Sequence, residues 1–136
     1  MSQGMEAQIQ AAADLSSACM LVAVYGSLKR GESNHHWLGD APYGGCVDLA
    51  GLQLYDLGPY PMAVASGLPS DRVQVELYAV SAQQLAQLDR LEDHPRDYQR
   101  RLLRLDDGRE AWVYLGRLAQ VHGYPRLEQG HWSGGA

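Results

Sequence analysis

The chain has no phenylalanine, only two cysteines and no long apolar run. Cys19 and Cys46 are too few for a disulfide framework and lack the spacing of metal ligands, so we expect a reduced, cytoplasmic protein. Cys46 has no activating neighbour and is expected to be a small core residue. No run approaches the roughly 20 apolar residues of a membrane span, and the N-terminus does not resemble a signal peptide, so no membrane partner is expected.

Positive charge is also scarce. The chain has 11 Lys and Arg against 16 Asp and Glu, giving a formal net charge of −5. A nucleic-acid partner requires a concentrated basic face, so none is expected. The hydrophobic fraction of 46% and the charged fraction of 20% are ordinary for one globular domain of 136 residues. Residues 1–20 are expected to form a poorly ordered extension, and residues 21–136 the domain. Oligomeric state is left open.

Strands dominate the apolar pattern. We expect strands over residues 21–24, 47–55, 62–65, 72–80, 98–105 and 110–115. Residues 34–38 should form a short helical turn with Trp37 and Leu38 facing inward. One amphipathic helix is expected from a capping box at Ser81 and Gln84 to an end near Glu92. This order of elements predicts an α+β fold with a mixed, barrel-like sheet.

The first strand ends abruptly at Tyr25, Gly26 and Ser27. Gly26 has no Cβ, so the backbone can turn sharply there and a ligand can come close. Amide N–H groups in such a bend can bind a carboxylate or a carbonyl oxygen that gains negative charge. The alternative is a plain strand-to-loop turn, which these residues alone favour. A phosphate loop is excluded, because Glu32 stands where that motif requires lysine.

Glu92 is the most notable acid, because it lies where the helix dipole places partial negative charge. That position raises the pKa of a carboxyl, as a general base working near neutral pH requires. The alternative is a solvated surface charge, which the residues alone favour. Ser27 lacks the Gly-x-Ser-x-Gly spacing of a nucleophile elbow. His35 and His36 point in different directions on a helix, and no metal site is expected.

A cluster of arginines flanks Tyr98: Arg96, Arg100, Arg101 and Arg104. One of them could pair with a substrate carboxylate, although a solvated strand face is the more ordinary interpretation.

Several separate motifs occur together in one order. They are Val24-Tyr-Gly-Ser-Leu-Lys-Arg-Gly31, Asn34-His35, Tyr60-Pro61, Val75-x-Leu77-Tyr78, Leu88-Asp89, Glu92, Tyr98-x-Arg100 and Val113-Tyr114. In these motifs the chain resembles the γ-glutamylcyclotransferase-like family, the group that includes γ-glutamylamine cyclotransferases and the plant AIG2-like proteins. The resemblance runs from about residue 21 to residue 114, with a looser match to residue 132.

The resemblance implies a small mixed β-barrel with helices packed outside. It implies that Glu92 is the catalytic acid/base and that Tyr25, Gly26, Ser27 and Leu28 form the substrate-binding loop. Tyr98 and Tyr114 are similar to tyrosines that line the family pocket.

The implied reaction converts a small γ-glutamyl amine or peptide to 5-oxoproline and a free amine, with no metal or cofactor. The alternative is a catalytically silent binding or regulatory protein with the same pocket. The motifs leave open which γ-glutamyl compound binds.

Overall fold

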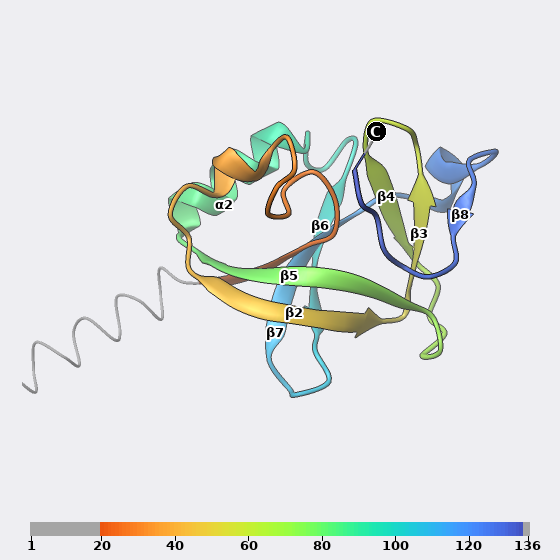
Figure 1. The fold of residues 1–136 in the computed structure, drawn as a ribbon, viewed down its shortest axis with the longest axis horizontal. Helices are drawn as coiled ribbons and strands as arrows, with labels where there is room; N and C mark the ends of the chain where they lie inside the picture. The colour runs from red at the N-terminus through yellow and green to blue at the C-terminus, as the bar shows by residue number, and fades with distance from the viewer. Residues whose placement is uncertain (1–19, 135–136) are drawn as a thin grey trace, which may run out of the picture.

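The computed structural model describes residues 20–134 (Figure 1). Apart from Met20, the extension expected over residues 1–20 lies outside this range. The elements in chain order are β1 (Met20–Val24), the 3-10 helix η1 (His35–Leu38), β2 (Tyr43–Ala50), β3 (Leu52–Asp56), β4 (Pro61–Ala65), β5 (Arg72–Val80), α2 (Ala82–Leu91), β6 (Gln99–Arg104), β7 (Glu110–Leu115), the 3-10 helix η2 (Leu118–Val121) and β8 (Arg126–Leu127).

The strands form two sheets. The larger has the order β2-β5-β1-β7-β6, and the smaller has the order β4-β3-β8. β1 is antiparallel to β5 but parallel to β7, so the larger sheet is mixed. The predicted α+β fold is therefore confirmed. The expected barrel is only a loose description, because the two sheets do not close on each other.

β5 and α2 follow the sequence pattern closely. Alternate residues Val73, Val75 and Leu77 of β5 are fully buried, as a strand with one face on the core requires. Ser81 caps α2: its side chain accepts from the amide of Gln84, whose side chain accepts in return from the amide of Ser81. No helix in residues 20–134 is long and apolar enough to cross a membrane.

The prediction of a single strand over residues 47–55 is wrong. Gly51 has a φ of 85° and separates β2 from β3, which belong to different sheets. Only glycine adopts this conformation without strain, so the chain can turn a corner there. The turn places β3 and β4 beside the larger sheet rather than within it (Figure 1).

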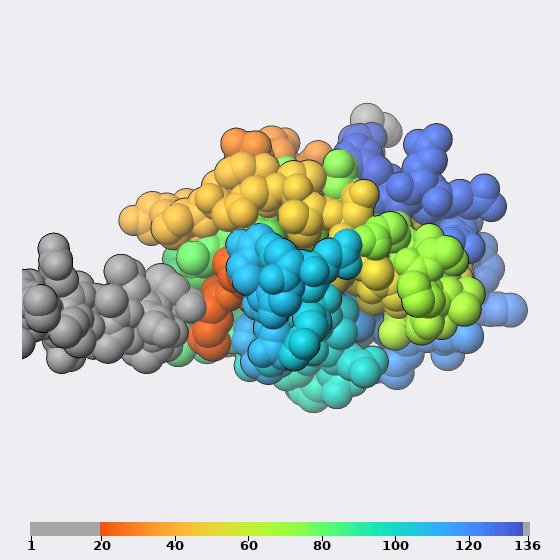
Figure 2. All heavy atoms as spheres, turned by 90° about the horizontal axis from the view of Figure 1, so that it is seen from below, coloured from red at the N-terminus to blue at the C-terminus, as the bar shows by residue number. Residues whose placement is uncertain are grey.

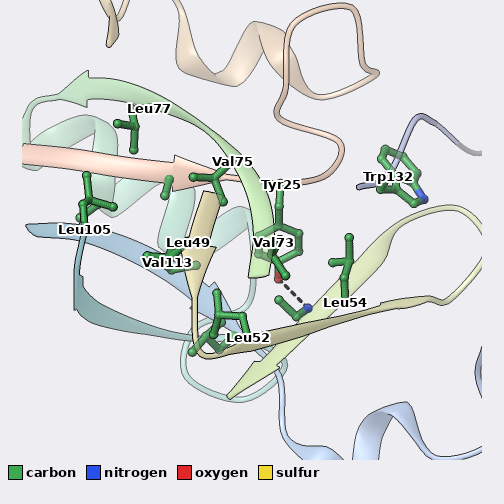
Figure 3. Close-up of a cluster of buried hydrophobic side chains, with 14 residues drawn as sticks. Tyr25, Leu49, Leu52, Leu54, Val73, Val75, Leu77, Leu105, Val113 and Trp132 are labelled. Carbon is green, nitrogen blue, oxygen red and sulfur yellow. Dashed lines mark hydrogen bonds between the residues drawn. The ribbon is translucent and has the colours of Figure 1, made fainter. Parts of the chain in front are cut away.

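Two apolar clusters form the core. One lies between the two sheets and contains Leu49, Leu54, Val75, Val113 and the C-terminal Trp132 (Figure 3). The other lies under α2, where Leu85 and Leu88 pack with Val22, Val80 and Tyr114. These contacts fix α2 against the sheet, and with it the residue that follows the helix.

Two smaller expectations are also wrong. Trp37 does not face inward: 43% of it is exposed, while Leu38 is buried as expected. Cys46 is not a core residue but an exposed, free thiol on β2.

In Figure 2 the turn between β6 and β7 faces the viewer beside the segment that links β4 and β5. An ion pair between Asp106 of this turn and Arg72, at the start of β5, joins these regions.

Candidate active site

A cavity of about 330 Å³ lies where the end of β1, the end of α2 and the start of β4 meet. This volume is at the low end of the roughly 300–1,000 Å³ typical of small-molecule sites. All seven predicted site residues line it: Tyr25, Gly26, Ser27, Leu28, Glu92, Tyr98 and Tyr114. Their placement around one cavity is a property of the fold, while their roles stay predictions.

The loop after β1, residues 25–28, lines this cavity, and Gly26 does so with its backbone alone. Within residues 20–134, no hydrogen bond takes up the amide N–H of Gly26, Ser27 or Leu28. A Cβ on Gly26 would lie 2.7 Å from two ring carbons of Pro61, so this position requires glycine for close packing. Unbonded amides at the wall of a cavity suit a carboxylate or an oxyanion.

Asn34 and Lys29 hold this loop in place. The amide of Asn34 donates to the carbonyl of Ser27 at 2.8 Å, and its side-chain Nδ2 donates to the Ser27 hydroxyl at 2.9 Å. Because the hydroxyl oxygen accepts from Asn34, its own proton is available to a ligand. The buried Lys29 ammonium donates to the carbonyl of Trp132, which ties the loop to the C-terminal segment.

Glu92 is placed by the way α2 ends. Its amide closes the last helical turn on Leu88 at 2.9 Å, and its carbonyl accepts from the amide of Tyr98 at 3.2 Å. Between them the chain turns through Asp93, whose φ of 51° lies in the left-handed region. The segment from residue 93 to residue 97 thereby folds back so that both Glu92 and Tyr98 reach the cavity.

The environment of Glu92 changes its acidity. Burial, followed by repulsion from Asp97, raises the pKa of Glu92 from 4.5 to about 7. No basic residue within residues 20–134 pairs with it. Glu92 is half-buried and lines the cavity, so the interpretation as a solvated surface charge is wrong. A carboxyl with a pKa near neutrality can both take up and release a proton at neutral pH.

The three tyrosines contribute ring surfaces. The Tyr25 hydroxyl donates to the carbonyl of Tyr114 and accepts from the amide of Ala63 at 3.1 Å, the contact dashed in Figure 3. Tyr98 donates to the carbonyl of Pro61 at 2.9 Å, and Tyr114 donates to Asp89 at 2.7 Å. Burial is the main factor that raises the pKa of all three phenols, so they stay neutral. Their hydroxyls fix the walls of the cavity.

No arginine of the predicted cluster lines the cavity. Arg100 instead forms a two-point ion pair with Asp89, at 2.8 and 3.1 Å, and stacks 4.3 Å from the ring centre of Trp112. Arg101 and Arg104 are exposed on β6. The sequence suggested that an arginine of this cluster pairs with a substrate carboxylate or lies on a solvated strand face. Arg100 does neither, because it pairs with Asp89.

Some cavity residues were not among the predicted site residues. Asn34 and Tyr60 stand in the motifs that carried the resemblance, so a signal for them was present. Asp97 precedes Tyr98 and lies in no motif, and nothing in the sequence pattern indicated that it lines the cavity.

Known proteins match this chain in sequence and in fold. The family model described as Gamma-glutamyl cyclotransferase, AIG2-like matches residues 22–134. The Gamma-glutamylcyclotransferase family protein YtfP of Escherichia coli K12 is 35% identical over 83% of this chain and 96% of its own. Gamma-glutamylaminecyclotransferase A of Danio rerio is 34% identical over 74% of this chain and 71% of its own.

A solved structure extends the match to three dimensions. An AIG2-like protein from Mus musculus superposes with a TM-score of 0.65 at 27% identity, covering 85% of this chain and 89% of its own. The resemblance seen in the motifs is thus confirmed, and the names of the relatives support an enzyme of the cyclotransferase type. The chain belongs to the gamma-glutamyl cyclotransferase, AIG2-like family.

Proposed function

We propose that this protein converts a γ-glutamyl amine or peptide to 5-oxoproline and a free amine, with Glu92 as the proton carrier. The observation that carries the proposal is the pairing of two features across one cavity. One is a carboxyl with a pKa of about 7, and the other is a loop with unbonded amides.

The substrate supplies its own nucleophile. Its α-amine lies within reach of its γ-carbonyl carbon, and attack closes a five-membered ring. Intramolecular reactions of this kind reach effective molarities of about 10⁵ to 10⁸ M when the geometry is right. The protein therefore has to fold the substrate, move protons and stabilise charge, and no side-chain nucleophile is needed.

The proton transfers are assigned to Glu92. Its carboxylate takes a proton from the α-ammonium group, the nitrogen forms a bond to the γ-carbonyl carbon, and the bond to the leaving nitrogen breaks. Overall, two protons leave the α-nitrogen and two reach the leaving amine, which departs as an ammonium ion. A group with a pKa near 7 suits both directions of transfer.

The amides of Gly26, Ser27 and Leu28 are assigned to the negative oxygen. N–H donors fixed before the reaction stabilise a developing oxyanion without reorganising. The same loop, with the Ser27 hydroxyl, could hold the α-carboxylate of the substrate. The rings of Tyr25, Tyr98 and Tyr114 would exclude water around the folded substrate.

The test is formation of 5-oxoproline from a panel of γ-glutamyl amines and γ-glutamyl amino acids, measured by mass spectrometry. We expect Glu92→Gln to lower kcat by about 10² to 10⁴, because general acid–base catalysis contributes about that much. Glu128→Gln, at an exposed position, is the matched control and should retain full activity. Ligand-induced thermal stabilisation without any 5-oxoproline would instead favour the silent binding protein.

A further inference from the structure

Lys29 is the only lysine in the chain, and it is buried. Only 7% of it is exposed, and within residues 20–134 no carboxylate forms an ion pair with it. Its ammonium group donates instead to a backbone acceptor, the carbonyl of Trp132. A buried ammonium without a counter-ion costs stability, because it loses its hydration. An apolar side chain of similar length would avoid this cost, so the charge indicates a role other than stability.

Lys29 also closes the turn that carries the unbonded amides of Gly26, Ser27 and Leu28. Its own amide donates to the carbonyl of Gly26 at 3.0 Å. Because a peptide group is planar, the direction of a carbonyl fixes the direction of the amide N–H that follows it. The bond to the Gly26 carbonyl therefore fixes the amide of Ser27, and a shift of Lys29 is passed on to that amide.

The acceptor of the ammonium belongs to a C-terminal segment, residues 126–132, that is fixed at several points. Its first two residues form β8, which pairs with β3. The carbonyl of Gly130 then accepts from the amide of Gln74 in β5 at 2.8 Å. Trp132 is buried in the cluster between the two sheets, and Tyr25, at the start of the loop, belongs to the same cluster (Figure 3). Both ends of the amide-bearing loop are thus tied to the part of the core that contains Trp132.

We propose that Lys29 is a positioning residue, whose ammonium holds the loop after β1 to the C-terminal segment and so keeps the amides of residues 26–28 directed into the cavity. Glu92 is placed separately, by the end of α2. The separation between the proton carrier and the amides therefore depends on the contact of Lys29. A displacement of about 1 Å in such a site can cost about a hundredfold in rate. This inference rests on the proposed function, since it concerns the loop assigned there to the negative oxygen.

Lys29→Met removes the ammonium and keeps an unbranched apolar side chain. We expect kcat for 5-oxoproline formation to fall about 10- to 100-fold with KM within about threefold of wild type, because the amides act on the transition state. The urea midpoint should change little, since the lost hydrogen bond is offset by the removal of a buried charge. A merely structural role would lower the midpoint and leave kcat alone. An unchanged kcat, whatever the midpoint, overturns the inference.

Gly130→Ala disturbs the same contact from the other side. Gly130 has a φ of 68°, and a Cβ there would overlap the carbonyl oxygen of Arg72, so the C-terminal segment has to move away from β5. We expect a loss of kcat similar to that of Lys29→Met, although the ammonium is intact. Full kcat in Gly130→Ala would contradict the inference.

The matched controls lie in the turn between β6 and β7. Arg109→Met removes an exposed cation and so changes the net charge as Lys29→Met does. Gly108→Ala places a side chain at a φ of 91° with no neighbouring atom within 4 Å, so it has the backbone strain of Gly130→Ala without the overlap. Both controls should retain the kcat of the wild-type protein.

NMR relaxation of the backbone amides tests the inference without any substrate. An order parameter of about 0.85 is typical of rigid backbone, and one below about 0.6 of flexible backbone. The amides of residues 26–28 should have the rigid value in the wild-type protein and fall to the flexible value in Lys29→Met, while the amides of α2 stay rigid. Rigid amides at residues 26–28 in Lys29→Met would overturn the inference.

The two measurements separate this inference from the proposed function. If no 5-oxoproline forms from any substrate, the proposed function fails, but the order parameters still decide whether Lys29 holds the loop. If 5-oxoproline forms and kcat is the same in Lys29→Met and the wild-type protein, the inference about Lys29 is wrong and the function stands.

Discussion

Asp89 and Glu92 lie three residues apart at the end of α2, yet their surroundings have opposite effects on them. Burial alone would raise the pKa of Asp89, but hydrogen bonds from Arg100 and Tyr114 outweigh it and lower that pKa. Burial also raises the pKa of Glu92, and there no cation opposes it. Both carboxyls face the negative end of the same helix dipole, so the dipole cannot explain the difference.

The comparison shows how one helix end carries both a structural acid and an acid that is available to a ligand. Asp89 is satisfied at both oxygens, by Arg100 and by Tyr114, and so ties α2 to β6 and β7. Glu92 has no side-chain hydrogen bond within residues 20–134 and lines the cavity. A partnered acid stays ionised and stabilises the fold, whereas an unpartnered acid in a cavity exchanges its proton near neutral pH.

The largest effect that tests this comparison is the pH dependence of turnover. Because the pKa of Glu92 is about 7, kcat/KM should fall about tenfold per pH unit below that value, or about a hundredfold by pH 5. The substrate ammonium is already protonated throughout this range and adds no further change. Initial rates of 5-oxoproline formation between pH 4 and pH 9 check the prediction. If kcat/KM instead falls only near pH 4.5, Glu92 is hydrated in solution or is not the base.

The next effect comes from removing the partner of Asp89. Arg100→Met should destabilise the fold by about 2 kcal/mol, measured by chemical denaturation at pH 7. A fully buried pair costs about 3–5 kcal/mol when broken, and this pair is partly exposed, with 22% and 20% of the two side chains accessible. The exposed neighbour Arg101→Met is the control and should lie within about 0.5 kcal/mol of wild type.

The pH dependence of this difference has a definite sign. A lowered pKa for Asp89 means that its contribution to stability is present above the unfolded pKa and is lost as the pH falls through the folded pKa. The gap between Arg100→Met and wild type should therefore shrink in acid. A gap independent of pH would assign the loss to packing on Trp112 instead of the ion pair.

The sequence specifies α2 well and the cavity poorly. The capping box at Ser81 and the spacing of Leu85 and Leu88 are local signals, so the helix and its end at Glu92 were predicted correctly. Whether Glu92 is buried depends on the segment of residues 93–97 folding back onto Tyr98. That contact does not follow from any periodic pattern in the sequence. The residues alone therefore favoured an exposed Glu92.

The same limit applies to the sheets. In residues 47–55 apolar residues recur at every second or third position, because β2 and β3 each bury one face, so the segment resembles a single strand. Only the pairing of β2 with β5 and of β3 with β4 and β8 shows that Gly51 is a corner. Motif resemblance supplied what periodicity could not, since it identified the family and brought residues far apart in the sequence into one site.

The smallest effect is the stability cost of the unpartnered acid. Folding raises the pKa of Glu92 from 4.5 to about 7. The resulting contribution to stability is fully present below pH 4.5 and is lost as the pH rises through 7. Glu92→Gln should therefore stabilise the fold by about 1–2 kcal/mol at pH 8 relative to its effect at pH 4. The shift itself sets an upper bound of about 3 kcal/mol, and the partial exposure of Glu92 to solvent reduces it. Thermal or urea melts at the two pH values measure it, with Glu128→Gln as the control. A Glu92→Gln protein that loses stability at pH 8 would mean that this carboxylate has a partner in solution, and the contrast with Asp89 would no longer hold.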